Sequence, residues 1–329
     1  MAVTRKSIAE LAGVSPASVS LALQGGRGVS TRTRERIVRI ARDLGYHPHG
    51  LASALAGSKV GLIGIIPTLA HNVIGPWDAM VMNGMAQVLS EAGMDWVVLS
   101  ESTRQPIPRI MKRSLVDGAA FLITPHERVF EWSKERGIPC VAINFDPGED
   151  VDRVLADDEG GIILAVQHLV SLGHRRIAYV ATGPFVHKSS ADARLMGYLR
   201  AMGGAGLRSR TPERRGLRVP EQVAWFQSVD APTAYVCYND HTAMELIQYL
   251  HEKGIRVPQD VSAVGADDMY ECRLFAPALT TVHVPFEEMG ERAAQILLSR
   301  ISGVDFPRER TVLPEQLVIR KSTGPPPGD

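Results

Sequence analysis

Apolar residues recur at helical spacing through the first part of the chain, up to about residue 45. Three sets lie at intervals of one to four residues and predict three helices: Ile8, Leu11 and Ala12; Val19 and Leu23; Ile37, Ile40, Ala41 and Leu44. Ser15 and Ser30 are suitable N-caps, and Pro16 suits a first helical turn. Gly13 and Gly45 can adopt the left-handed conformation that ends a helix. Three helices in so short a segment are typical of a helix-turn-helix domain, and a small helical bundle with another purpose is the alternative.

A short apolar segment follows the third helix. Pro48 breaks the chain, and an almost uncharged helical pattern comes after it: Leu51, Ala52, Ala54, Leu55 and Ala56. A helix of this length is not stable alone. We therefore expect it to form when another surface packs on it.

From residue 60 onwards, apolar runs that end in turn residues alternate with helical patterns. The runs are VGLIGIIPT, WVVLS, GAAFLITP, IPCVAINFD, RRIAYVATG, TAYVCYND and VSAVGADD. The helical patterns are Gly75–Ala92, Glu159–Leu172, Ser189–Met202, Asp240–Lys253 and Phe286–Ile301. Alternating strands and helices predict parallel sheets, and a second first strand near Arg176–Thr182 predicts two doubly wound subdomains. Such subdomains bind ligands at the carboxyl ends of their strands, in the cleft between them.

Composition is ordinary for a globular protein of two or three domains. Of 329 residues, 45% are hydrophobic and 22% are charged. The N-terminal segment lacks the apolar core of a signal peptide, and no apolar run approaches the ~18 residues that span a membrane. Cys140, Cys237 and Cys272 lack metal-ligand spacing and are expected as buried thiols. We therefore expect a cytoplasmic, nucleoid-associated protein with no membrane contact, no metal and no cofactor.

Charge is unevenly distributed along the chain. Residues 1–59 contain nine Lys/Arg and three Asp/Glu, a net charge of +6, and the remaining 27 basic and 33 acidic residues carry −6. A basic segment attached to an acidic body favours a polyanionic partner, with a solvated helical face as the alternative.

The N-terminal segment resembles the DNA-binding head and hinge of the LacI/GalR family of bacterial transcription regulators. The matching stretches are AELAGVS, ASVS, VSTRTRERI, LGYHP and LASALAG. The resemblance implies a homodimer on a palindromic double-stranded operator, with the two hinge helices paired in the minor groove. In that family a hinge leucine wedges into a central base step, and Leu55 holds the matching position, flanked by Ala52 and Ala56.

The recognition helix is unusually apolar for that family. Arg or another polar residue usually stands where this chain has Leu21, and Pro16 and Ala17 also lack a side chain that hydrogen-bonds a base. Base discrimination is therefore expected from thymine methyl contacts and from the hinge kink, with a core position as the alternative for Leu21. The remaining expected DNA contacts are polar: Thr4, Ser15, Ser18, Ser20 and Arg32.

The body continues the resemblance and is similar to periplasmic sugar-binding proteins. Supporting stretches are DDEGGIILAVQHLVSLGHRRIAYV, DARLMGY, PTAYVCYND, GIRVPQDVSAVGADD and PALTTVHVPFEEMGERAAQIL. Two stretches depart from the family pattern. The segment from 207 to 231 is shorter than usual, so a strand or helix at the cleft edge is expected to be trimmed, and TLAHNVIGPWDAM lacks the usual polar-aromatic pattern.

The resemblance implies an effector site at strand ends. Arg194 matches the arginine that grips the effector, Asp267 the carboxylate after the VG strand, and Asn239 the polar residue of ND. Alternatively, Arg194 and Asp267 pair across the closed cleft, and Asn239 caps the helix that begins at Asp240. Aromatic stacking is expected from Trp77 or Phe286, although Trp77 is equally suited to the core. The weaker candidates are Asn144, His71 and Asn72.

These observations predict a sequence-specific transcription regulator, a repressor, that is controlled by a small carbohydrate-type effector. The expected domains are residues 1–47 (DNA-binding), 48–59 (hinge) and 60–329 (effector-binding and dimerisation). Within the body, the expected N-subdomain is 60–158 with 286–312, and the C-subdomain is 159–285 with 313–323. A solute-binding protein and an enzyme are the alternatives. The motifs GxGxxG, GxxxxGK[ST] and GxSxG are not found between strand and helix, which disfavours an enzyme.

Overall fold

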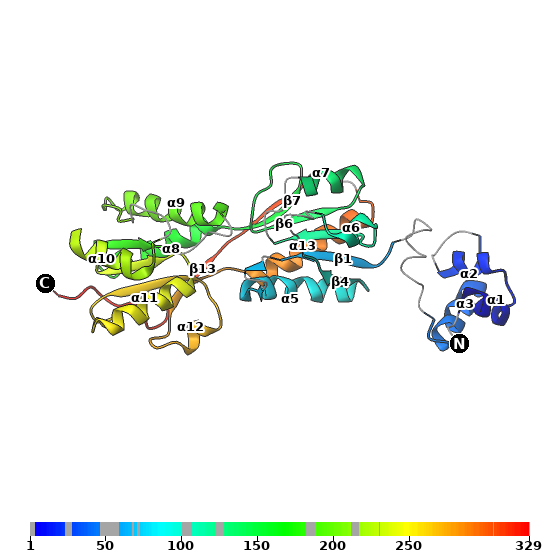
Figure 1. Cartoon of the computed structure of the whole chain (residues 1–329), viewed down its shortest axis with the longest axis horizontal. Helices are drawn as coiled ribbons and strands as arrows, with labels where there is room; N and C mark the ends of the chain where they lie inside the picture. The colour runs from blue at the N-terminus through cyan, green and yellow to red at the C-terminus, as the bar shows by residue number, and fades with distance from the viewer. Residues whose placement is uncertain are drawn as a thin grey trace. The chain divides into compact units, whose positions relative to one another are not determined.

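A computed structural model describes residues 4–23, 28–46, 59–67, 69–70, 73–100, 107–122, 128–181, 188–211, 217–229, 231–304 and 306–328. The chain forms two compact units. One unit holds the described residues up to Gly61 together with 110–117, and the other holds 62–109 and the described residues from Gly118 onwards. Figure 1 shows the elements of both units.

The head of the first unit is a three-helix domain, as predicted. It contains α1 (Arg5–Ala12), α2 (Pro16–Leu23) and α3 (Thr31–Asp43). The side chains of Thr4, Ser15 and Ser30 accept hydrogen bonds from backbone N–H groups in the first turns of these helices, and Gly13 ends α1 with φ of 62°.

The head core uses smaller residues than expected. Its buried side chains are Ile8, Ala9, Ala12, Val19, Ala22, Ile37 and Ala41. The prediction that Leu11 and Leu44 face inward is wrong, because they are 64% and 36% exposed. Leu11 therefore lies on a solvent-facing side of α1, and Leu44 is the C-cap residue at the end of α3.

The N-lobe, as we name the elements around the first sheet of the body, has six parallel strands. Their order is β12 (Arg310–Leu313), β7 (Asp152–Ala156), β6 (Cys140–Ile143), β5 (Gly118–Phe121), β1 (Leu62–Ile66) and β4 (Asp95–Val98). Helices α5 (Pro76–Glu91) and α13 (Phe286–Ile301) pack together on one face. Helix α7 (Arg128–Glu135) covers part of the other face, where Phe130 contacts Phe121. The pair β2 (Leu69–Ala70) and β3 (Val73–Ile74) is a smaller element of the second unit, and residues 110–112 of α6 (Arg109–Lys112) belong to the first unit.

The C-lobe is built around the second sheet of the body, which has five strands. Their order is β13 (Gln316–Val318), β11 (Thr280–His283), β10 (Ser262–Asp267), β9 (Ala234–Cys237) and β8 (Ile177–Val180), and only β13 pairs antiparallel. Helices α8 (Asp158–Ser171) and α9 (Lys188–Gly204) cover one face. Helices α10 (Val219–Val229) and α11 (Asp240–Glu252) cover the other, and α12 (Glu271–Leu274) follows β10. The two parallel-sheet subdomains that the sequence predicted are therefore present.

The chain passes between the lobes three times. It crosses after β7, after β11 and after β12, and the second crossing takes α13 back to pack on α5 of the N-lobe. The two helices cross at very short range. A Cβ atom built on Gly84 would lie 2.0 Å from the carbonyl oxygen of Glu287, and one on Gly290 would lie 2.0 Å from that of Val81. Glycine at both positions therefore allows the backbones to touch.

In its described residues, the segment 207–231 that was expected to be shortened contains the helix α10. Residues 207–211 run beside β8, and the backbone N–H of Tyr179 donates to the carbonyl oxygen of Arg210 (2.9 Å). The edge of the C-lobe sheet is therefore paired by irregular backbone at this point.

Candidate functional site

The second helix of the head presents an exposed apolar surface. Pro16 and Ala17 are exposed, and Leu21 is 39% exposed, whereas Val19 and Ala22 on the same helix are buried. This placement excludes the alternative that Leu21 is a core residue. Leu21 is thus exposed enough to contact another molecule, and its contact with DNA stays a prediction.

The polar candidates of the head are partly engaged with one another. The hydroxyl of Ser15 accepts a hydrogen bond from the backbone N–H of Ser18 (3.1 Å), and the two hydroxyls lie 2.9 Å apart. Ser20 accepts from Arg5 Nη1 (3.3 Å), and Arg5 Nε donates to the hydroxyl of Tyr46 (3.2 Å). Arg5 is a residue that the sequence reasoning missed, and it connects α1 to α2 and to the end of the head.

The other DNA-contact candidates have simpler placements. Thr4 caps α1, and Arg32 is exposed in the first turn of α3. The hinge candidates Ala52, Leu55 and Ala56 lie outside the described residues.

In the body, Arg194 is the centre of a buried ionic cluster. Its side chain is 3% exposed. Nε donates to Asp158 (2.6 Å), Nη1 to the carbonyl oxygen of Tyr238 (2.7 Å) and Nη2 to Asp267 (2.9 Å). Burial alone would lower the pKa of Arg194, but Asp158 and Asp267 hold it well above its ordinary value. The guanidinium is therefore permanently charged and held from three directions.

The expected pairing of Arg194 with Asp267 thus exists, but within one lobe. Arg194 comes from α9 and Asp267 from the end of β10, both in the C-lobe, whereas the alternative reading placed the pair across the closed cleft. Asp158, which sequence reasoning did not single out, begins α8 and also accepts from the hydroxyl of Ser190 (2.6 Å). A second carboxylate on the arginine makes this a network instead of a single pair.

The carboxyl end of β10 has unusual backbone geometry. Asp267 and Asp268 have φ values of 117° and 56°, in the region that L-residues rarely adopt. Asp268 in turn is bound by Arg320 and contacts His283 (3.2 Å). Backbone outliers of this kind are concentrated at ligand sites, because only a rigid surrounding structure retains them.

Two further acids lie near the cluster. Asp240, the first residue of α11, accepts from the hydroxyl of Thr281 (2.5 Å) and the backbone N–H of Met269 (2.8 Å). Burial and the neighbouring Asp267 raise the pKa of Asp240 to about 7. Burial also raises the pKa of Asp267 to about 6, against the opposing effect of Arg194. The second of these acids, Glu315, is 6% exposed. Asp240 and Asp267 therefore titrate near neutral pH, and burial raises the pKa of Glu315 well above its usual range.

The remaining effector candidates are less directly placed. Asn239 caps α11, because its Oδ1 accepts from the backbone N–H of Thr242 (2.9 Å), as the alternative reading stated. Trp77 is half-buried, and the centroid of its ring lies 5.9 Å from that of Phe286. Phe286 is 2% exposed and belongs to the N-lobe core. Asn144 follows β6 with φ of 64° and is 8% exposed.

His71 and Asn72 lie outside the described residues. Thus Arg194 and Asp267 are brought together at the carboxyl ends of the C-lobe strands, with Asn239 two residues after the end of β9.

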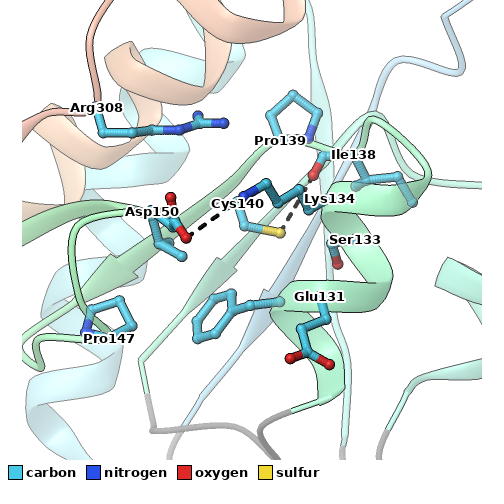
Figure 2. Close-up of a pocket in the computed structure, with 11 residues that line it drawn as sticks. Glu131, Ser133, Lys134, Ile138, Pro139, Cys140, Pro147, Asp150 and Arg308 are labelled. Carbon is cyan, nitrogen blue, oxygen red and sulfur yellow. Dashed lines mark hydrogen bonds and ion pairs between the residues drawn. The ribbon is translucent and has the colours of Figure 1, made fainter.

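A separate hollow of about 540 Å³ lies in the N-lobe, at the opposite end of its strands (Figure 2). Cys140, Asp150 and Arg308 line it, and they begin or precede β6, β7 and β12. Lys134 and Asp150 form an ion pair of 3.6 Å at the hollow, and Cys140 Sγ donates to the carbonyl oxygen of Ile138 (3.5 Å). Burial raises the pKa of Cys140 to about 11, so its thiol is not a nucleophile at neutral pH.

Neither a metal-binding cluster nor a membrane-spanning helix is present in the described ranges. Within them, no group of three or more His, Cys, Asp and Glu side chains is arranged to hold a metal ion. Nor does any helix in the described part of the chain have the length and apolarity to cross a membrane.

Comparison with known proteins covers nearly the whole chain. The family model described as bacterial regulatory proteins, lacI family, matches residues 4–49, and the periplasmic binding protein-like domain matches residues 166–323. The HTH-type transcriptional repressor PurR of Mannheimia succiniciproducens is 28% identical over 341 residues, which cover 97% of this chain and 98% of that protein.

Two solved structures are similar over 98% of this chain and 100% of their own. They are the lac repressor dimer bound to operator and the anti-inducer ONPF (25% identity, TM-score 0.78) and the transcriptional regulator CelR–cellobiose complex (28% identity, TM-score 0.69). In both, the similarity extends from the head through both lobes of the body.

Proposed function

This chain belongs to the LacI/GalR family of bacterial transcription regulators, and on that basis we propose that it is a repressor that binds a palindromic operator as a homodimer. It is a DNA-binding regulator, not an enzyme, and a small-molecule effector controls it. The effector is of the carbohydrate type and occupies the cleft between the N-lobe and the C-lobe.

The observation that carries the effector assignment is the buried network around Arg194. Two carboxylates and a carbonyl hold the guanidinium at the strand ends where doubly wound sheets bind ligands. Asp267 is the more exposed partner, with 18% of its side chain accessible against 7% for Asp158. Asp267 is therefore the group that accepts hydrogen bonds from effector hydroxyls, and Arg194 orients it.

The proposed contact surface for a second copy is apolar and lies on both lobes. Trp96 and Val98 are 40% and 37% exposed on β4, the edge strand of its sheet. Tyr270, the N-cap residue of α12, and Leu274, its last residue, are each 70% exposed. Unpaired strand edges and exposed apolar side chains are stabilised when a partner covers them. Two paired bodies would present two heads to the two half-sites of an operator.

The proposed mechanism is a shift between two lobe orientations. Effector binding favours one orientation, which changes the spacing of the two hinge segments of the dimer and so the affinity for the operator. On DNA, Leu21 contacts thymine methyl groups, and Leu55 wedges into the central base step. Polar head residues contact phosphates and fix the register.

The first test is the selection of operators from a random DNA library by the full chain, followed by competition at fixed salt. Leu55→Ala is expected to reduce the preference for selected over random DNA more than Leu21→Ala does. Leu21→Arg is expected to change the preferred base at one position in each half-site, because arginine pairs with guanine. If Leu21→Ala abolishes specificity while Leu55→Ala retains it, the proposed insertion of Leu55 into the central base step is wrong. Selected sequences without two-fold symmetry, or a monomer in sedimentation on the operator, would contradict the dimer.

The second test is a panel of neutral sugars against a panel of planar heterocycles, read as the change in operator affinity. We expect a neutral sugar to change it, and Arg194→Ala to abolish that change while operator binding without the sugar persists. A response to heterocycles alone would reject the carbohydrate class. An unchanged sugar response in Arg194→Ala would reject the site.

A further inference from the structure

Glu315 is a buried acid at the last crossing from the N-lobe to the C-lobe. Leu313, at the end of β12, packs against the N-lobe core, and Leu317, in β13, packs against a C-lobe core. Between them Pro314 and Gln316 are exposed, whereas Glu315 is 6% exposed. The crossing therefore buries one side chain, and that side chain ends in a carboxyl group.

The carboxyl group is seated against the first turn of α8. A Cβ atom built on Gly161 would lie 1.8 Å from Oε2 of Glu315, so the seat requires a glycine. Neither oxygen of Glu315 has a hydrogen-bond partner among the residues that the structure describes. The charged groups that act on it are Asp157, Asp158, Arg194 and Asp267.

An unpaired carboxylate is costly to bury, so this seat favours the neutral acid. Burial, with Asp158 nearby, raises the pKa of Glu315 well above its usual range. Arg194 is the one cation in that set, and its donors already bind Asp158, Asp267 and a carbonyl.

The first and last crossings leave the N-lobe side by side. Strands β7 and β12 are parallel neighbours, with Ala156 opposite Leu313. The backbone N–H of Asp157 donates to the carbonyl oxygen of Leu313 (2.9 Å). Asp158 lies two residues after Ala156, and Glu315 lies two residues after Leu313. Asp158 begins α8, and the carboxyl group of Glu315 lies against Gly161 in the first turn of the same helix. Bending at these crossings changes the position of Glu315 relative to the Asp158–Arg194 pair.

We propose that Glu315 is a positioning residue that couples the orientation of the two lobes to the charge balance around Arg194. In the orientation described here, the carboxyl stays in its dry seat as the neutral acid. When the crossing bends and water reaches Glu315, its carboxyl group ionises and becomes a third carboxylate near the guanidinium of Arg194. The added negative charge weakens the ion pair between Arg194 and Asp267. Rising pH therefore favours the hydrated orientation. The inference rests on the proposed role of Arg194 in effector binding.

The test is the distance between the lobes as a function of pH, without DNA or effector. Spin labels are placed on exposed helix positions of each lobe through Gln87→Cys in α5 and Gln248→Cys in α11, with Cys140→Ser in the background. Labelled chain is diluted with unlabelled chain, and distance distributions are recorded from pH 5 to pH 9. The ratio of the populations of the two lobe orientations is expected to change with pH. The total change is about tenfold for each unit of difference between the Glu315 pKa values in the two orientations.

Glu315→Gln keeps the shape of the side chain without its titration, and Glu315→Met is a second uncharged variant of similar length. Both are expected to keep the low-pH distribution throughout, with less than a ~2-fold change in the ratio. Glu288→Gln, which removes an exposed carboxyl from α13, is the matched control and should follow the parent chain. The proposal is overturned if the parent distribution does not change with pH, or if both Glu315 variants follow the parent. The lobe-distance measurement can be interpreted even if the operator or sugar tests of the proposed function fail, because it uses neither DNA nor sugar.

Discussion

Replacing Arg194 by methionine removes the cation from a network that stays buried. The guanidinium makes three hydrogen bonds of 2.6 to 2.9 Å and is 3% exposed, so water cannot replace it. Methionine is of similar length and fills the space, but it leaves Asp158 and Asp267 facing each other without a counter-charge. Removing one partner of a buried pair costs ~3–5 kcal/mol of folding free energy, and we expect Arg194→Met to fall in this range at pH 7.5.

The loss should depend on pH, with a sign that follows from the acids. Burial already raises the pKa of Asp267 to about 6 with the arginine present, and without the arginine it rises further. The folded variant then binds protons that the unfolded chain releases. Its stability relative to the parent therefore recovers as the pH falls from 7.5 through 6 to 5.

The assay is urea unfolding followed by far-ultraviolet circular dichroism at pH 7.5 and 5.5. Arg200→Met is the matched control, because Arg200 lies on the same helix, forms an ion pair with Glu159 and has 67% of its side chain exposed. This control should lose at most ~1 kcal/mol. The double variant Arg194→Met/Asp267→Asn should recover ~1–3 kcal/mol, since it removes one unpaired charge. A loss equal to that of Arg200→Met, without recovery at pH 5.5, would refute the reasoning.

Three further outcomes are expected. Gly84→Ala should lower the free energy of unfolding by ~1–3 kcal/mol in urea titrations, because its Cβ would meet the Glu287 backbone, whereas Gly203→Ala, with open space around it, should be neutral or stabilising. Ser15→Ala should speed hydrogen exchange of the α2 amides by the equivalent of ~1 kcal/mol; unchanged protection would show that the cap contributes nothing. The folded pKa of Asp240 is raised to about 7, so parent stability should fall as pH rises from about 4 to 7; Asp240→Asn should flatten this slope in urea midpoints, and an identical slope would contradict the assignment.

Local patterning predicted the types of the main elements and the fold class, and the family resemblance indicated the class of protein. Helical spacing and capping residues in the head, and apolar runs followed by turns in the body, predicted three helices and two parallel-sheet lobes, and both are present. Short elements with little periodicity were missed, among them β7, β11 and β13. β13 also pairs antiparallel, which no local pattern indicates, because strand direction depends on the path of the chain between lobes.

The head illustrates the limit of periodicity. Leu11 and Leu44 fit the helical stripe as well as Ala9 and Ala22 do, yet only the alanines are buried. Helical spacing fixes which residues share a face, but the distance between helices decides which of them the neighbouring helix covers.

The candidate site also has features that the sequence indicates and features that only the tertiary structure creates. The sequence placed Asp267 after a strand pattern, and the family resemblance pointed to Arg194 within the helical pattern Ser189–Met202. Only the tertiary structure decided that they meet within one lobe, that Asp158 completes the network, and that Glu315 is buried beside it. These residues are as much as 157 positions apart in the chain. Their ionisation depends on burial and on neighbouring charges, and both are created only when the crossings bring the strand ends together.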